Sequence, residues 1–255
     1  MSEYRLVLSA ALVTAGCLLV SACGGTPGHG GASGRPTDGT RTSAAPAPSK
    51  PAPTAALPTP GAAGEIPDTA RLAELALQPG ETAGVLEDGG STHSLDWVEG
   101  RPLSPAELKD PCTAMWGLLR QRGAHAAVSQ TFDTEEPGNP TVNSLSSYPG
   151  TDASTVFGRL RTALAGCPSV EEDGRTVTIR YENLDTAGFP EDTLRIRMTM
   201  TDAGSTGPAE VIDRIVTRVG VCITDLSATG TEPYPGISET PVLRQIDRLR
   251  AAQGL

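Results

Sequence analysis

The sequence predicts an α+β domain in which a mainly antiparallel sheet packs with about three helices. Three segments repeat apolar residues at the three- and four-residue spacing of an amphipathic helix. Other segments alternate apolar and polar residues, which is typical of strands with one face on a core and the other in water. These segments follow one another as helix, strands, helix, three strands and helix, which is an α+β layout.

Residues 1–22 have the pattern of a lipoprotein signal peptide. Arg5 precedes an uncharged apolar run of 15 residues from Leu6 to Val20. A helix needs about 20 apolar residues to span a bilayer, so this run is typical of a signal-peptide core and not of a membrane span. The chain is therefore predicted to be exported.

The apolar run ends in Val20-Ser21-Ala22-Cys23, which resembles the bacterial lipobox. In a lipobox the cysteine is diacylated on its sulfur and the chain is cleaved before it, here between Ala22 and Cys23. Two acyl chains give stable membrane attachment, whereas one gives marginal binding, so Cys23 is the predicted lipid-attachment site. The alternatives are an ordinary secreted protein cleaved near Ala22 and a lipobox at Cys17, where a threonine stands in the place of the aliphatic residue.

Residues 23–65 are predicted to form a disordered linker that begins at the lipidated cysteine. Of the 42 residues from 24 to 65, 35 are Gly, Pro, Ala, Ser or Thr, and Leu57 is the only large aliphatic residue. Such a stretch buries too little apolar surface to offset the entropy of ordering it. We expect the linker to hold the domain away from the membrane.

The domain is predicted to comprise residues 66–255, and it is acidic. It carries 16 basic and 27 acidic side chains, a net charge of −11. This balance argues against a nucleic-acid partner, because binding to phosphates depends on clustered Lys and Arg side chains. Solubility is the simplest interpretation of the charge, and an acidic recognition face is the alternative.

The first predicted helix follows two N-terminal capping signals. Residues 104–107 (Ser-Pro-Ala-Glu) have the form of a capping box, and Asp110 offers a second cap before a proline. Gly123 is a candidate for the left-handed residue that ends the helix. The residues at helical spacing, which place Cys112 on the buried side, are Cys112, Met115, Trp116 and Leu119.

The rest of the domain alternates between strand and helix patterns. Residues 124–132 and a weaker segment around 142–148 are predicted strands, and a helix capped by Thr151 ends near Gly166. Three strands are predicted next, around residues 177–181, 194–200 and 211–223. A last helix is predicted from Pro241 to Gln253, with Thr240 as its cap.

Three cysteines remain in the domain, at positions 112, 167 and 222. An exported domain lies in an oxidising compartment, so one disulfide is expected. Cys112 and Cys167 lie near the start of one predicted helix and the end of another, which suits an antiparallel pair joined by a bridge. A bridge that involves Cys222, or no bridge at all, is the alternative.

A search for chemistry finds no catalytic or metal-binding motif, so we predict neither an enzyme nor a metal or other cofactor. The paired carboxylates at 135–136, 171–172 and 191–192 border turn residues and are expected to be solvated. Trp97 is a candidate to line a ligand groove together with Tyr148 or Tyr181, although most aromatic side chains pack in cores.

The order of motifs resembles that of actinobacterial lipoproteins, and more narrowly it is similar to the PknH-like extracellular sensor-domain family. The shared features are the lipobox, the Pro/Thr/Ala linker, Asp110-Pro111-Cys112, a helix from Leu160 that ends in Ala-Gly-Cys167, and Arg218-Val219-Gly220-Val221. The resemblance covers about residues 70–253. It implies an extracytoplasmic α+β domain with a central cleft for an unknown ligand and no demonstrated catalysis. The family's kinase receptor domain carries paired disulfides, whereas three cysteines here allow one bridge.

The sequence therefore predicts a lipoprotein anchored through Cys23 to the outer face of the bacterial plasma membrane. Its domain is expected to bind a small molecule, a cell-wall component or an envelope protein without catalysing a reaction. The alternatives are a cell-envelope hydrolase that uses scattered carboxylates and a structural envelope protein.

Overall fold

The structure is a computed structural model. It describes residues 56–61, 65–81, 91–94, 101–132, 140–172, 174–184, 188–190, 192–204, 206–234 and 236–255. The predicted signal peptide, the lipid-attachment site and most of the predicted linker lie outside these residues.

The described residues form one eight-stranded sheet whose neighbouring strands all run antiparallel, so the predicted α+β class is confirmed. The strand order across the sheet is β1-β2-β3-β8-β7-β6-β5-β4. The strands are β1 (Ser91–Ser94), β2 (Ala126–Phe132), β3 (Thr141–Ser147), β4 (Ser169–Glu172), β5 (Arg175–Asn183), β6 (Thr193–Asp202), β7 (Glu210–Val219) and β8 (Cys222–Thr231).

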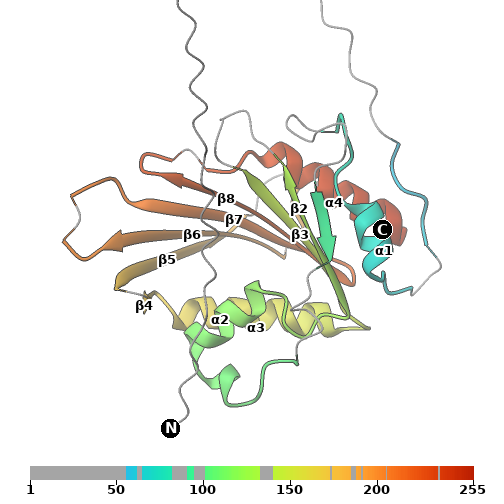
Figure 1. Cartoon of the computed structure of the whole chain (residues 1–255). Helices are drawn as coiled ribbons and strands as arrows, with labels where there is room; N and C mark the ends of the chain where they lie inside the picture. The colour runs from blue at the N-terminus through green and yellow to red at the C-terminus, as the bar shows by residue number, and fades with distance from the viewer. Residues whose placement is uncertain are drawn as a thin grey trace, which may run out of the picture. The chain divides into compact units, whose positions relative to one another are not determined.

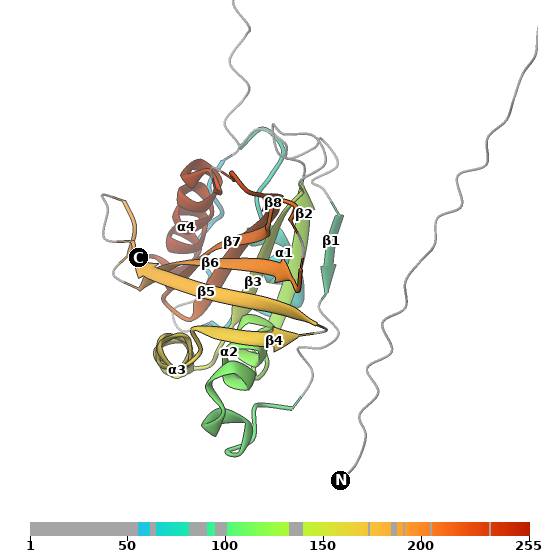
Figure 2. The same cartoon turned by 90° about the vertical axis from the view of Figure 1, so that its left-hand side faces the viewer.

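Helices cover parts of both faces of the sheet (Figures 1 and 2). One face packs against α2 (Pro111–Leu119) and α3 (Asp152–Gly166), and the other against α1 (Thr69–Leu75) and α4 (Glu239–Gln253). The expectation that one face would lie in water is therefore wrong. No helix among the described residues has the length and apolar character needed to cross a bilayer.

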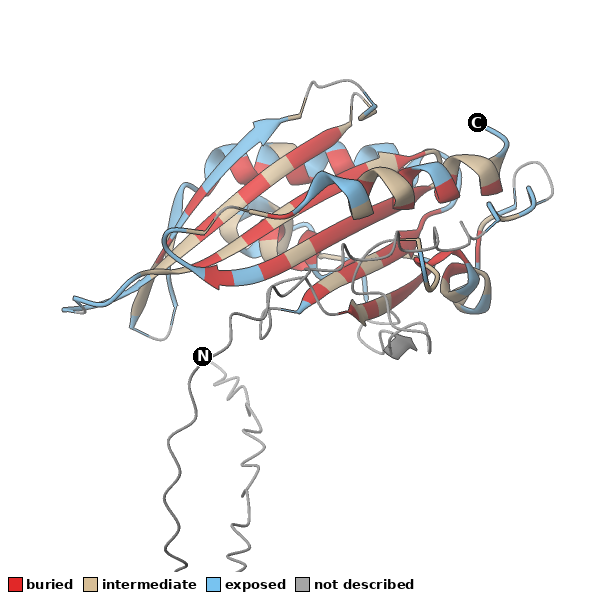
Figure 3. Ribbon diagram, turned by 90° about the horizontal axis from the view of Figure 1, so that it is seen from above, coloured by how far each residue is buried: buried red, intermediate tan, exposed pale blue. Residues whose placement is uncertain are grey.

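Two apolar clusters, one on each face, explain this arrangement. Ile215 packs into the cluster with α1 and α4, and its neighbour Val216 packs into the cluster with α2 and α3. Successive side chains of a strand point to opposite faces, so a strand at the centre of the sheet must be apolar on both sides. Figure 3 shows the buried bands that result along the central strands.

Capping residues set the ends of three helices. Ser104 and Glu107 make the predicted capping box, in which each backbone N–H donates to the side chain of the other residue. The box precedes the short 3-10 helix η2 (Glu107–Lys109). The carboxylate of Asp110 accepts from the Thr113 N–H at the start of α2, and Gly254 ends α4 in the left-handed conformation. At the start of α4 the N-cap is Ser238 and not Thr240.

The segment predicted as one strand over residues 211–223 is two strands. Val219 pairs with Cys222 across the turn formed by Gly220 and Val221, so β7 and β8 form a tight hairpin. Gly220 has φ +56°, a conformation that glycine adopts without steric cost. Cys222 therefore begins a strand, and its buried thiol faces the cluster beneath α4.

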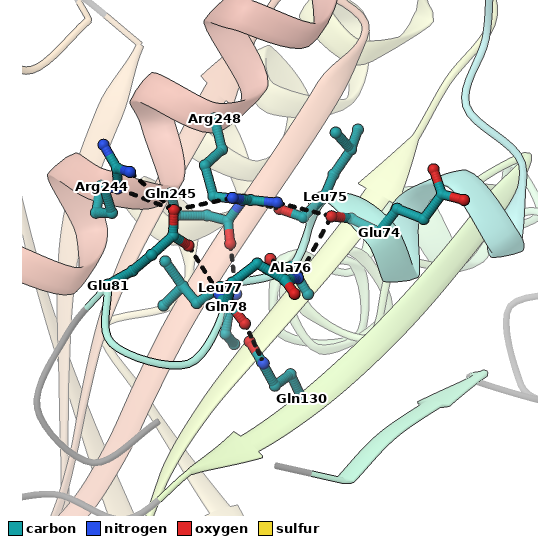
Figure 4. A network of polar contacts seen from close by, with 11 residues as sticks. Glu74, Leu75, Ala76, Leu77, Gln78, Glu81, Gln130, Arg244, Gln245 and Arg248 are labelled. Carbon is teal, nitrogen blue, oxygen red and sulfur yellow. Dashed lines mark hydrogen bonds and ion pairs between the residues drawn. The ribbon is translucent and has the colours of Figure 1, made fainter. Parts of the chain in front are cut away.

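Helix α1 was not predicted from the sequence. It has only seven residues, and its cap is Asp68, which accepts from the Arg71 N–H. The C-terminal end of α1 is held to α4 by buried polar side chains, including Arg248, which donates to the carbonyls of Glu74 and Leu75 (Figure 4). The end of the predicted linker also contacts α4, since the Gly61 N–H donates to the Ala252 carbonyl.

A disulfide joins Cys112, near the start of α2, to Cys167, which follows the last residue of α3. This is the predicted pairing, and it is confirmed. The two Cα atoms are 5.1 Å apart. Cys222 is a free cysteine with a buried side chain, and burial raises its pKa to about 12.

Candidate functional site

An open cavity of about 450 Å³ lies between the C-terminal end of α2 and the sheet. This is within the usual size range of small-molecule sites. Its sheet residues alternate with residues of the α1–α4 cluster, so they point to the face that carries α2 and α3. The cavity is lined by Trp116, Leu119, Arg120, Gln121, Ser129, Val142, Ser144, Arg214 and Ser227.

Gln121 is the most unusual residue of this cavity. Its φ of 53° makes it the only described residue other than glycine with a positive φ, a conformation that costs an L residue roughly 1–2 kcal/mol. The residue is only 5% exposed, and its side-chain Nε2 donates to the Leu119 carbonyl at 3.0 Å. Its Oε1 is buried and has no hydrogen-bond partner. The left-handed conformation is that of a Schellman motif, because Gln121 directly follows Arg120, the C-cap of α2.

Neighbouring contacts hold Gln121 in this conformation. Its own backbone N–H donates to Leu118, and the next residue, Arg122, donates from its backbone to Gly117. The Arg122 guanidinium also binds the Glu107 carboxylate at 3.0 Å. Hydrogen bonds from Ser104, followed by those from Arg122 and Arg101, hold the pKa of Glu107 well below its usual range. The capping box therefore anchors the loop that carries Gln121.

Arg214 and Asp225 form an ion pair on adjacent strands beside the cavity. The Arg214 Nε lies 3.2 Å from Asp225 Oδ1, and its Nη2 donates to Oδ2. The same Nη2 reaches the Leu119 carbonyl at 3.5 Å. The remaining terminal nitrogen, Nη1, has no hydrogen bond to any described residue. Arg214 thus brings donors to the cavity while Asp225 compensates its charge.

Three serine hydroxyls complete the polar lining. Ser129, Ser144 and Ser227 are half-buried on β2, β3 and β8, and their side chains make no hydrogen bond within the described part of the chain. A hydroxyl can both donate and accept. Trp116, also half-buried, adds an aromatic surface to the same cavity.

We expect the substitution Gln121→Gly to stabilise the domain by about 1 kcal/mol. Glycine removes both the backbone strain and the unpaired oxygen, and these gains exceed the lost hydrogen bond to Leu119. Urea unfolding monitored by circular dichroism measures the change. Gln121→Ala is the matched control, because it removes the oxygen but keeps the strain, so it should gain less. A glycine variant less stable than the wild type would contradict this account of Gln121.

Of the predicted groove aromatics, the structure describes Tyr148 and Tyr181, and Trp97 lies outside the described residues. Tyr148 is buried in the cluster with α2 and α3, and burial raises its pKa to about 12. Tyr181 is exposed near the end of β5, beside a separate open cavity that Tyr148 does not line. Strand β4 pairs with β5 only as far as Thr178, so Tyr181 lies where β5 forms the edge of the sheet.

The other predicted site residues are far from this cavity or outside the described chain. The structure does not describe Ala22, Cys23 or the carboxylates at 135–136. Glu171 and Glu172 are exposed on the short strand β4, and Asp192 pairs with Arg161 and Arg218. Within the described ranges no group of three or more His, Cys, Asp or Glu side chains is arranged to hold a metal ion.

The sequence analysis did not identify Asp225 or Gln121 as site residues, but the sequence does contain a signal for Asp225. Asp225 interrupts the apolar run of residues 222–226, and a charged residue in a central strand indicates a buried partner. Gln121 carries no such signal, because glycine or asparagine, and not glutamine, is the usual left-handed residue after a helix C-cap.

Comparison with known proteins finds similarity only among solved structures. No protein-family model matches the sequence, and no curated protein matches it. The crystal structure of the extracellular domain of PknH from Mycobacterium tuberculosis is similar, with a TM-score of 0.43 and 12% sequence identity over 73% of this chain and 96% of that one. At this level the likeness carries no argument about function, which therefore rests on the residues of the chain itself.

Proposed function

We propose that this chain is an extracytoplasmic lipoprotein, anchored to the outer face of the membrane through Cys23, with a non-catalytic, sensor-like domain. Its ligand, a small molecule or part of a cell-wall component or protein, binds in the cavity at the end of α2. The observation that carries this proposal is the set of side chains that meet in the cavity: three half-buried serine hydroxyls that make no hydrogen bond within the described residues, the Arg214 guanidinium and the Trp116 indole. A bound ligand would supply partners for these groups.

Two features support the extracytoplasmic location. The Val20-Ser21-Ala22-Cys23 motif follows an apolar run of signal-peptide length. The disulfide between Cys112 and Cys167 is of the kind that persists in oxidising compartments and is rare in the cytosol. The Gly- and Pro-rich stretch between the motif and the domain has the composition of a tether.

The cavity lining supports recognition as its role. Its polar groups are a carboxamide, three hydroxyls and the guanidinium groups of Arg120 and Arg214, of which that of Arg214 is paired with Asp225. A small number of placed polar groups beside an aromatic surface is typical of ligand sites. Ligand binding to the folded state raises the apparent stability of a protein. A compound that binds here should therefore raise the melting temperature of the wild type but not of the Gln121→Gly variant.

A thermal-shift screen on the purified protein tests this role. A compound supports the proposal if it stabilises the wild type and the surface control Thr178→Ala equally. It should stabilise the Gln121→Gly variant much less. Compounds that stabilise all three variants equally bind elsewhere. If every stabilising compound behaves in that way, the cavity is not the ligand site.

We expect Cys23→Ala to abolish membrane attachment. Without the thiol no acyl chain is added, and the apolar run is too short to anchor the chain alone. Cell fractionation with immunoblotting measures the distribution between membrane and medium, and mass spectrometry of the wild type checks for a diacylglyceryl group on Cys23. Cys17→Ala is the matched control and should leave attachment unchanged. Full retention of Cys23→Ala in the membrane would contradict the lipoprotein assignment.

A further inference from the structure

We infer that the ligand of this cavity carries a carboxylate or phosphate group, which binds to Arg120 and Arg214. This inference rests on the proposed ligand-binding function and adds the chemical class of the ligand. It follows from the charge of the cavity lining, from the hydrogen-bond donors that this lining leaves unused and from the register of the strands that carry them.

The lining of the cavity is positively charged, although the domain as a whole is acidic. Arg120 and Arg214 line the cavity, and none of the described lining residues is acidic. Asp225 is buried beside Arg214 and offsets the charge of that residue. The Arg120 guanidinium is exposed and makes no ion pair within the described part of the chain, so one positive charge remains without a counter-charge. An anionic ligand would supply that counter-charge.

The C-terminal end of α2 does not use the Arg120 side chain as a cap. The backbone carbonyls of residues 116–119 already accept hydrogen bonds from the backbone of residues 120–122 and from the Gln121 and Arg214 side chains. The last carbonyls of a helix are the groups that otherwise bind a nearby arginine. The donors of Arg120 are therefore available to a ligand.

Two other arginines, Arg159 and Arg180, also make no ion pair with a described residue, but their surroundings differ. Arg180 lines its cavity together with Glu182, which is an acidic neighbour. Arg159 lines a cavity between α2 and α3 whose two threonine hydroxyls donate to carbonyls of α3 and of its N-cap. The cavity at Arg120 instead combines a second guanidinium with hydroxyls that make no hydrogen bond within the described ranges.

The strand register places one of these hydroxyls beside Arg214. Ser227 on β8 lies directly opposite Arg214 on β7, and such pairs have Cβ atoms about 4.5–5.5 Å apart. Arg214 Nη1 and the Ser227 hydroxyl have no partner among the described residues, while the other Arg214 nitrogens bind Asp225 and Leu119. Guanidinium donors form short, charge-assisted hydrogen bonds to carboxylate and phosphate oxygens. Both unused donors can therefore bind one oxyanion.

The remaining lining residues indicate that the anionic group is one end of a larger molecule. Ser129 on β2 and Ser144 on β3 lie directly opposite each other. The order β2-β3-β8-β7 and the usual strand spacing place β2 about 14 Å from β7, which is farther than one carboxylate or phosphate can reach. We expect an uncharged part of the ligand to contact these serines and the Trp116 indole.

Two-dimensional NMR of the ¹⁵N-labelled protein tests the ligand class with four probes that differ in one substituent of a benzene ring. Phenyl phosphate and benzoate are anions at neutral pH, benzamide is uncharged and benzamidine is a cation. We expect one or both anions to shift the Trp116 indole and Arg214 Nε–H signals at concentrations about tenfold lower than benzamide or benzamidine requires. The anion that binds more tightly then distinguishes a phosphate ligand from a carboxylate ligand.

A variant of Arg120 connects the binding to the charge of the cavity. Arg120→Gln should weaken binding of the tighter anion by about tenfold and leave benzamide binding unchanged. Arg159→Gln is the matched control, because it removes the same charge from an exposed position on α3 that lines a different cavity, and it should bind as the wild type does. Arg214 is kept, because its removal would leave Asp225 buried without a counter-charge. An unchanged pattern of amide signals outside the cavity shows that each variant is folded.

The outcomes separate this inference from the proposed function. If benzamide or benzamidine binds as tightly as the anions or more tightly, the anionic class is overturned and ligand binding at this site stands. Anion binding that Arg120→Gln does not weaken, or that Arg159→Gln weakens equally, also overturns the inference. If no probe shifts the two cavity signals, the result counts against both.

Discussion

Removal of the Cys112–Cys167 disulfide is expected to lower the free energy of unfolding by about 4 kcal/mol. The bridge closes a loop across a sequence separation of 55 residues, and the chain-entropy model gives this magnitude for a loop of that length. The bridge also joins the start of α2 to the end of α3, and these two helices form much of one apolar cluster. Since a domain is typically stable by only about 5–15 kcal/mol, this loss is large.

Urea unfolding of the double variant Cys112→Ala and Cys167→Ala measures this loss. Reductant should destabilise the wild type to a similar extent and leave the double variant unchanged. Cys222→Ala is the matched control, because Cys222 is buried but free, so this variant should keep its sensitivity to reductant. A double variant as stable as the wild type would contradict the prediction.

Glu81→Gln is expected to destabilise the domain by about 3–5 kcal/mol. The Glu81 carboxylate is fully buried and lies 2.9 Å from both Arg244 and Arg248, of which Arg248 is only 4% exposed at its side chain. Figure 4 shows these groups between α4 and the backbone that follows α1. A glutamine keeps the shape but leaves two guanidinium groups without their counter-charge, and breaking a buried ion pair on one side costs this much.

A matched pair of variants separates burial from charge. Glu74→Gln also removes a carboxylate that pairs with an arginine, Arg71, but the Glu74 side chain is 67% exposed, so a change of less than about 1 kcal/mol is expected. Unfolding by urea at constant pH measures both variants. If Glu81→Gln and Glu74→Gln lose equal stability, the buried network does not hold α1 to α4.

Most of the secondary structure could be predicted from the sequence, because helix capping and the spacing of apolar residues are local properties of the chain. The capping signal at Asp110 and the spacing along residues 152–166 placed the start of α2 and the whole of α3 correctly. The predicted end of α2 at Gly123 is wrong, because α2 ends at Leu119 and the left-handed residue that follows its C-cap is Gln121. The hairpin between β7 and β8 was missed because the alternation of apolar residues continues through its two-residue turn. Gly220 was the available signal, since an isolated glycine within a strand pattern can mark a turn.

The candidate site was predicted much less well, for a physical reason. Arg214, Gln121 and Ser144 are distant in the sequence, and only the pairing of β3 with β8 and of β8 with β7 brings them together. The exposure of Tyr181 was not predicted, because burial depends on the neighbouring strands as well as on period. Tyr181 has the same parity as Ile179 but lies past the end of the pairing with β4, where β5 forms the edge of the sheet.

The contacts at the N-terminal edge of the domain determine where a pulling force would enter it. Thr59 accepts from Arg71 in α1 and Gly61 donates to Ala252 in α4, so tension along the preceding chain is borne first by these two helices. The cavity lined by Gln121 and Arg214 opens on the opposite face of the sheet, beside α2. A force applied through residues 59–61 would therefore enter the domain on the face that does not carry this cavity.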